Sequence, residues 1–187
     1  MKNLIIILIT FLGFTAQAQD TEMLCFINQY RAAHGKNPLV ISDKLTVIAT
    51  TCNENNSAND TLIHTKLGKT ESTGEICTMS KSLPFTRDSK EAFVKFIKVN
   101  FNLVYAEPRT NEEVIKYAKL LSIYNFDQSP AHKKLLLSNV TNVGFNVICK
   151  NIVKGKAATK IIGGKTYTFK NLTESYKFDC FVTIDFN

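Results

Sequence analysis

The chain has 187 residues but no tryptophan, only four prolines and eight glycines, and no repeated or low-complexity segment. None of its cysteine pairs has the Cys-x-x-Cys spacing, which disfavours the zinc-ribbon and thioredoxin-like motifs. The basic residues are scattered and form no polybasic run, so the positive charge disfavours a nucleic-acid-binding protein. These absences favour one folded domain with a sizeable core, in keeping with an apolar content of 44%.

Residues 1–18 have the features of an export signal. Lys2 supplies a positive start, an apolar run follows from Leu4 to Phe14, and Ala16-Gln17-Ala18 places small residues where a signal peptidase cleaves. The apolar run is shorter than the roughly 20 residues that a membrane-spanning helix needs. We therefore expect a single mature domain over residues 19–187, secreted or periplasmic and without a membrane span. Loss of Lys2 lowers its formal net charge from +7 to +6.

Helical spacing of apolar residues predicts four helices in the mature chain. They cover about residues 21–33, 42–52, 89–105 and 111–126. We expect the polar run from Asn53 to Asp60 to end the second helix and start a loop, because asparagine and aspartate favour turns. Pro108 should end the third helix, and Ser129 should end the fourth because Pro130 follows it. The break at Pro130 places His132 just beyond a helix end.

After His132 the spacing of the apolar residues changes from that of a helix to that of a strand, in which every second residue is apolar. Residues 143–149 and 176–186 both alternate apolar with mostly polar positions, and Gly163-Gly164 predicts the turn of a lysine-rich hairpin between them. The pattern predicts an antiparallel sheet with one buried face, on which Cys149 and Cys180 lie. Helices followed by such strands indicate one α+β domain.

Several short motifs follow one another in a recognisable order. They are Asn28 to Gly35 with Pro38-Leu39, Leu45 to Cys52, His64, Gly74-Glu75, Phe126 to His132, and Asn139 to Gly144. Together they resemble the CAP superfamily (cysteine-rich secretory proteins, antigen 5, pathogenesis-related 1) in its bacterial SCP-domain form, over nearly the whole mature chain. The resemblance implies an α-β-α sandwich with a central antiparallel sheet, in which His64, Glu75 and His132 converge in one surface cleft.

The sequence departs from the family pattern in ways that bear on function. Ile76, Phe126 and Ala131 replace an asparagine, a tryptophan and a glycine of the motifs, and Ser129 stands where eukaryotic members carry a second cleft glutamate. Because the second carboxylate is missing, we expect a non-enzymatic binding or interaction module rather than an enzyme. Its ligand would be a protein, a peptide or a lipid, and we expect a monomer.

Two other functions remain open. His64, Glu75 and His132 are candidate catalytic residues of a metal-dependent protease or esterase, in which His64 and His132 would bind a divalent ion such as zinc. The same trio can equally form a hydrogen-bonded cluster without reactivity. A secreted lipid or sterol carrier is the second alternative, since an apolar stripe on the third helix could line a groove, although a core-facing helix explains that stripe better. The stripe consists of Phe93, Phe96, Ile97 and Phe101.

All five cysteines follow the expected cleavage site and would enter a compartment that permits disulfides. The resemblance makes the two C-terminal strands sheet neighbours and so implies a bond between Cys149 and Cys180. Cys52 and Cys77 form a weaker candidate pair, which would leave Cys25 as a buried free thiol. The alternative is that all five are reduced and packed.

Overall fold

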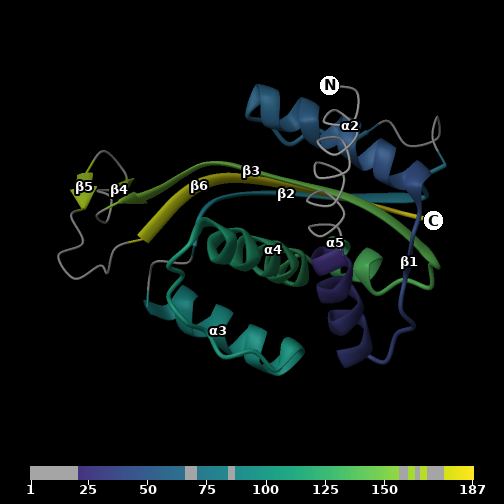
Figure 1. Ribbon diagram of the computed structural model, residues 1–187, viewed down its shortest axis with the longest axis horizontal. Coiled ribbons are helices and arrows are strands. Elements are labelled where there is room, and N and C mark those ends of the chain that lie inside the picture. The colour runs from purple at the N-terminus through teal and green to yellow at the C-terminus, as the bar shows by residue number, and fades with distance from the viewer. Residues whose placement is uncertain (1–20, 66–70, 84–86, 156–159, 163–164, 168–174) are drawn as a thin grey trace, which may run out of the picture.

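The computed structural model describes residues 21–65, 71–83, 87–155, 160–162, 165–167 and 175–187. Its centre is a four-stranded sheet in the order β1-β3-β6-β2 (Figure 1). The strands are β1 (Val40–Ile41), β2 (Gly74–Ser82), β3 (Asn142–Gly155) and β6 (Ser175–Phe186). β6 pairs antiparallel with both β2 and β3, while the short β1 pairs parallel with β3 and makes the sheet mixed at that edge.

Helices cover both faces of this sheet (Figure 1). One face carries α2 (Asp43–Asn59), and the other carries α3 (Arg87–Phe101), α4 (Asn111–Gln128), α5 (Pro130–Leu136) and an unlabelled helix over residues 21–33. The α-β-α sandwich that the motifs implied is therefore confirmed. No helix in the described segments is long and apolar enough to cross a membrane.

The apolar core lies between the sheet and the larger helical layer. The period-two pattern of both long strands places its apolar positions here, including Phe145, Val182 and Ile184. The stripe on α3 is buried in the same core, with Phe93 and Ile97 fully inaccessible. The core interpretation of this stripe is thus confirmed, and these side chains line no lipid groove.

Two predicted helix ends were wrong. The polar run after Cys52 does not form a loop, because α2 continues to Asn59 and ends at Asp60 in a left-handed conformation. Asn53 and Asn56 are buried on its inner side, where bonds to other segments outweigh their weak helix propensity. The third helix ends at Phe101, before a left-handed Asn102, and not at Pro108.

The break before His132 is confirmed. Ser129 has an extended backbone, and Pro130 stands at the first turn of α5, where its missing amide hydrogen costs no helical bond. The buried Arg31 fixes the far end of α5, since its Nη1 donates to the carbonyl oxygens of Leu136 at 2.7 Å and Ser138 at 3.1 Å. His132 is therefore held on a short helix that starts at Pro130 and is anchored by Arg31 at its far end.

The hairpin after β3 is described only in part. β4 (Lys160–Ile162) and β5 (Lys165–Tyr167) pair antiparallel, with Ile162 opposite Lys165. The predicted turn residues Gly163 and Gly164 lie outside the described residues.

Two features hold β3 in place. Cys149 is directly opposite Cys180 in β6 and is bonded to it, with 4.0 Å between the Cα atoms, so the implied disulfide is confirmed. Closing a loop of this length contributes on the order of 3 kcal/mol of stability. On the other face, Gly144 lies so close to α2 that a Cβ atom there would come within 2.1 Å of the backbone of Leu45 and Thr46.

Candidate functional site

The space between α2 and the sheet differs from the apolar core because its inner surface is polar. Sheet register places Glu75 opposite Asp185 and Cys77 opposite Thr183, all four on the α2 face and all buried. Asn53 of α2 donates from Nδ2 to the carbonyl oxygen of Phe181 at 3.1 Å. A helix is thus held on the sheet by polar contacts as well as by packing.

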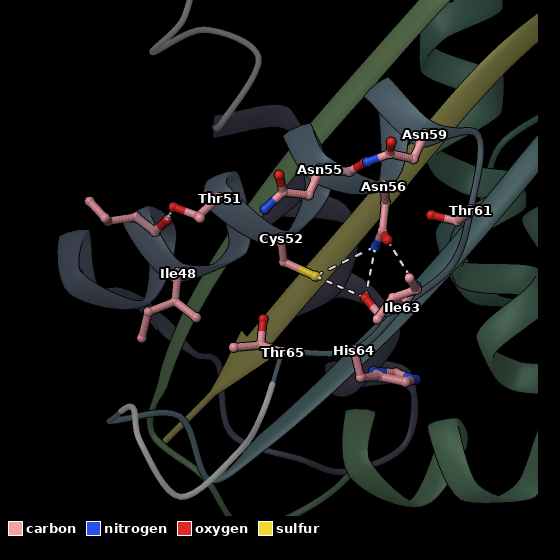
Figure 2. A pocket seen from close by; sticks show the side chains of 11 residues that line it. Ile48, Thr51, Cys52, Asn55, Asn56, Asn59, Thr61, Ile63, His64 and Thr65 are labelled. Atoms are coloured by element: carbon pink, nitrogen blue, oxygen red, sulfur yellow. Dashed lines mark hydrogen bonds between the residues drawn. The ribbon is translucent and has the colours of Figure 1, made fainter.

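Asn56 of α2 positions the segment that carries His64. Its Oδ1 accepts from the Ile63 amide at 2.8 Å, and its Nδ2 donates to the Ile63 carbonyl at 3.1 Å. The Cys52 thiol donates to that carbonyl as well, at 3.3 Å (Figure 2). Both backbone groups of Ile63 are therefore hydrogen-bonded to side chains of α2, much as they would be to a neighbouring strand, and this fixes the backbone next to His64.

The imidazole of His64 meets the carboxylate of Glu75. His64 Nδ1 lies 3.0 Å from Glu75 Oε1, which also accepts from the Thr65 amide at 2.9 Å. The Glu75 side chain has 0% exposure and that of His64 has 54%, so the imidazole screens the carboxylate from solvent. Glu75 Oε2 is buried without a hydrogen-bond partner in the described part of the chain.

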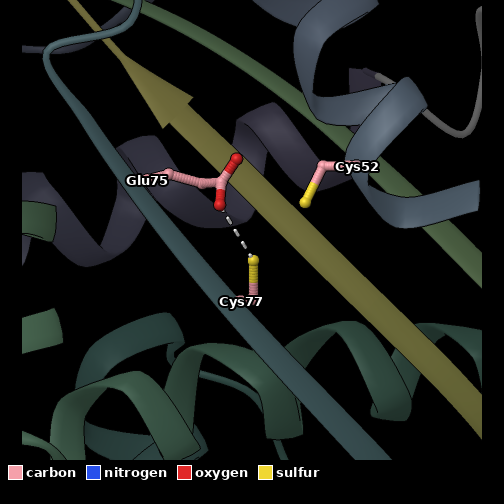
Figure 3. Close-up of side chains that lie close together, drawn as sticks. All are labelled: Cys52, Glu75 and Cys77. Atoms are coloured by element: carbon pink, nitrogen blue, oxygen red, sulfur yellow. Dashed lines mark hydrogen bonds between the residues drawn. The ribbon is translucent and has the colours of Figure 1, made fainter. Parts of the chain in front are cut away.

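Two thiols complete this cluster. Cys77 Sγ lies 3.5 Å from Glu75 Oε1 and 3.8 Å from His64 Nδ1. Figure 3 shows the Cys52 and Cys77 sulfurs and the Glu75 carboxylate directed into one space, and ligand atoms of these three residues lie within 4.8 Å of one another. Burial raises the pKa of the Cys77 thiol, and the nearby Glu75 adds to the rise, so Cys77 is a neutral thiol here.

The expected second disulfide is absent, because Cys52 and Cys77 are both free and buried. They come close because α2 packs on β3 and β6, and β6 is the neighbour of β2, but the cluster keeps each sulfur hydrogen-bonded to other groups. Cys25 was expected to be buried and is exposed instead, since it lies on the outer side of the helix over residues 21–33.

Asp185 adds a second buried carboxyl group beside Glu75. Burial raises the pKa of Asp185 to about 7, and the neighbouring Glu75 carboxylate adds to the rise. Neither of its oxygens has a hydrogen-bond partner among the residues described. The nearby Ser72 hydroxyl donates to the Gly74 carbonyl at 3.0 Å. Two adjacent carboxyl groups therefore place three unpartnered oxygens in this layer.

His132 stands apart from the cluster. Its ring meets the edge of Phe126 at a centroid distance of 5.6 Å. Burial lowers the pKa of His132, and the influence of His64 lowers it further. Within the described segments, however, His132 has no hydrogen bond to His64 or Glu75. Of the candidate trio, the structure joins His64 and Glu75 directly, and it offers no shared carboxylate that would orient both imidazoles on one metal ion.

Sequence reasoning gave no site role to Cys52, Asp185 or Thr183. A signal for two of them was present, because the apolar alternation that assigns Val182 and Ile184 to the core places Thr183 and Asp185 on the opposite face. No pattern in the sequence indicated that Cys52 of α2 would lie near Glu75 and Cys77.

A groove opens on the outer side of the cluster, between α2 and residues 61–65 (Figure 2). Its volume is about 380 Å³. Apolar, amide and hydroxyl side chains dominate its lining, and none of its lining residues is a carboxylate or a lysine: Val47, Ile48, Thr51, Cys52, Asn55, Asn56, Asn59, Thr61, Ile63, His64 and Thr65.

Comparison with known proteins agrees with the motifs. The family described as Cysteine-rich secretory protein family (CAP) matches residues 24–154, and the chain belongs to this family. No curated protein matches. Among solved structures, the chain is similar to an outer surface protein from Borrelia burgdorferi, with 15% sequence identity and a TM-score of 0.45 over 91% of this chain and 92% of that one.

Proposed function

We propose that this CAP-family protein is an exported binding module without catalytic activity, and that its ligand occupies the groove beside His64. The observation that carries the proposal is the burial of Glu75, whose side chain has 0% exposure. A general base must reach the proton that it removes, directly or through one water molecule. A carboxylate enclosed by Thr65, His64 and Cys77 has no free path to a substrate in the groove.

The groove favours an uncharged, extended peptide segment. Val47, Ile48 and Ile63 offer apolar contacts, while Asn55 and Asn59 offer amide groups that can bond a peptide backbone. Such a lining lacks a carboxylate or lysine that would select a charged ligand. Exposed apolar side chains on one side, with 66% exposure for Val47 and 65% for Ile63, are typical of an interaction surface.

Export of one monomeric domain, residues 19–187, is part of the proposal. The signal features of residues 1–18 support it, as does the disulfide between Cys149 and Cys180, because disulfides persist in oxidising compartments.

Selection of uncharged heptapeptides displayed on phage against the purified protein tests the groove. Val47→Arg should weaken the selected peptides by about tenfold or more, because it places a charged chain across the apolar side of the groove. Val99→Arg is the matched control, since Val99 is an equally exposed helical valine on α3, 70% against 66% for Val47. Peptides that bind Val47→Arg as tightly as the wild type would contradict the proposed groove.

The enzymatic alternative has its own test. Zinc-dependent cleavage of peptide or ester substrates by the wild-type protein, lost in His132→Ala, would replace the binding module with a hydrolase. We expect no turnover above that of buffer with zinc.

A further inference from the structure

The cluster beneath the groove has a donor set that the peptide-binding proposal does not use. Two buried cysteines, one carboxylate and one imidazole gather from three separate segments: α2, β2 and residues 61–65. Thiolate and imidazole are the preferred ligands of zinc. This donor set differs from the histidine pair that the family resemblance implied, because it includes two sulfurs and omits His132.

The spacing fits one tetrahedral ion. A zinc ion with ligand distances of about 2.0 to 2.3 Å holds its ligand atoms roughly 3.3 to 3.8 Å apart. Here His64 Nδ1 and Glu75 Oε1 are 3.0 Å apart, while Cys77 Sγ lies 3.5 Å from that oxygen and 3.8 Å from that nitrogen. Cys52 Sγ is within 4.8 Å of the Glu75 and Cys77 ligand atoms, so binding would draw this sulfur toward the ion.

An independent observation points to a cation. Glu75 Oε2 and both Asp185 oxygens are buried and have no hydrogen-bond partner among the described residues. Burying a carboxylate without a partner is costly, and a bound cation is one way in which proteins compensate that cost. Glu75 and Asp185 lie opposite each other on adjacent strands, so a cation held by Glu75 would also favour the ionised form of Asp185.

Groups that would support bound thiolates are already in place. Asn56 Nδ2 donates to Cys52 Sγ at 3.5 Å. The Thr183 hydroxyl lies 3.5 Å from Cys77 Sγ and donates to Asn53 Oδ1 in the metal-free protein, so its proton would turn toward the Cys77 thiolate when an ion binds. Hydrogen bonds of this kind orient metal ligands and stabilise the negative sulfur.

We infer that these four side chains form a site for zinc, or a similar thiophilic divalent ion, between α2 and β2: Cys52, His64, Glu75 and Cys77. Binding removes the two thiol protons, which pass to solvent, while the imidazole proton of His64 moves from Nδ1 to Nε2. The ion then joins two thiolates, one carboxylate and one neutral imidazole through Nδ1. The inference goes beyond the proposed function, because zinc binding requires no ligand in the groove.

The test is a zinc titration of protein purified without reductant under anaerobic conditions, which keeps the disulfide between Cys149 and Cys180 intact. We expect one zinc per chain, and thiolate-to-metal charge-transfer absorption when cobalt is the probe. Cys52→Ser and Cys77→Ser should each weaken zinc binding by about 100-fold or more. Cys25→Ser is the matched control and should leave binding unchanged, because Cys25 is free but lies away from the cluster.

A second measurement needs no variant and so does not depend on whether a buried substitution folds. At a urea concentration at which the zinc-free wild-type protein begins to unfold and expose these thiols, zinc should protect Cys52 and Cys77 from alkylation while Cys25 stays reactive. Equal alkylation of all three with and without zinc would overturn the site. So would recovery of Cys52 and Cys77 joined by a disulfide from protein exported by cells, or loss of binding in Cys25→Ser.

Two more variants test the fourth ligand and separate the zinc site from the peptide groove. His64→Ala should also weaken zinc binding, whereas unchanged affinity would reduce the site to two sulfurs and one carboxylate and contradict the assigned donor set. Val47→Arg, which disrupts the proposed peptide groove, should bind zinc like the wild type. A protein that binds no peptide would therefore contradict only the proposed groove, and a protein that binds no zinc would contradict only the proposed zinc site.

Discussion

The two faces of the sheet are both buried, but they are stabilised in different ways. Toward α3, α4 and α5 the strands present large apolar side chains such as Phe145 and Ile184, which join one core. Toward α2 the same strands present Thr183 and Asp185, and the helix buries Asn53, Asn56 and Ser57 against the sheet together with the apolar Leu45. Area removed from water stabilises the first face, whereas the second depends on specific hydrogen bonds and leaves some polar atoms unpartnered.

This difference explains where the candidate site lies. Burying an unpaired charged group among apolar side chains costs a large free energy of folding. The cluster of reactive side chains therefore lies on the face that is already polar. The α2 face holds the carboxylates, thiols and imidazole together because its hydrogen bonds specify geometry as well as contribute stability.

The largest effect should come from the close approach of α2 to the sheet. Gly144→Ala places a Cβ atom 2.1 Å from the backbone of α2, and backbone cannot move aside without displacing the helix. We expect a loss of about 3 kcal/mol or more in urea unfolding. On the apolar face, Gly74→Ala meets only the side-chain end of Leu135 at 2.6 Å and should cost clearly less. Similar losses of stability for both variants would contradict the claim that the close backbone contact between Gly144 and α2 is rigid.

Removing a buried polar side chain on the α2 face should lower the free energy of unfolding more than shortening a buried apolar side chain on the other face. Asn53→Leu removes the donor to the Phe181 carbonyl and the acceptor, at 3.2 Å, of the Thr183 hydroxyl. We expect a loss of about 2 to 4 kcal/mol, since buried partners are left without bonds. Ile184→Val, which shortens a fully buried side chain in the core, should cost about 1 kcal/mol. Chemical unfolding curves of the two variants decide the order, and the reverse order would refute the contrast between the faces.

The smallest effect concerns acid stability on the core side of the sheet. Burial raises the pKa of Asp127, but hydrogen bonds from Lys133 at 2.7 Å and Tyr30 at 2.6 Å outweigh it and leave the pKa lowered. A lowered pKa means that its ionised form adds stability above the ordinary value and loses it as pH falls through the lowered one. Asp127→Asn should cost about 1 kcal/mol near neutral pH.

Thermal unfolding of both proteins from about pH 6 to about pH 2 measures this effect. The difference between them should shrink toward the acid end. A constant difference across the range would assign the effect to packing and not to charge.

The core side of this fold was largely predictable, and the α2 side was not. Val143, Val182 and Ile184 alternate so regularly that their burial follows from the sequence alone. The helical course of Asn53 and Asn56 depends on bonds to Phe181 and to residue 63, which no local pattern encodes. Propensity therefore gave the wrong end for α2.

Strand and site predictions show the same division. β2 mixes Thr78 and Ser80 with apolar residues and carries no clear alternation, and β1 has only two residues, so neither was predicted. The pairing of His64 with Glu75 was accessible only through the family resemblance. The approach of Cys52 to Cys77 depends on how α2 packs across the sheet, and their free state depends on competing partners such as Thr183.

The central position of β6 has a consequence for how the chain acquires its structure. β6 follows every other described strand in the chain, yet it lies between β3 and β2 and pairs Phe186 with Gly74, more than a hundred residues earlier. Neither long neighbour has its partner until β6 has been synthesised, because these contacts are non-local. A fragment that lacks β6 would leave the facing edges of β2 and β3 open and would therefore be prone to aggregate.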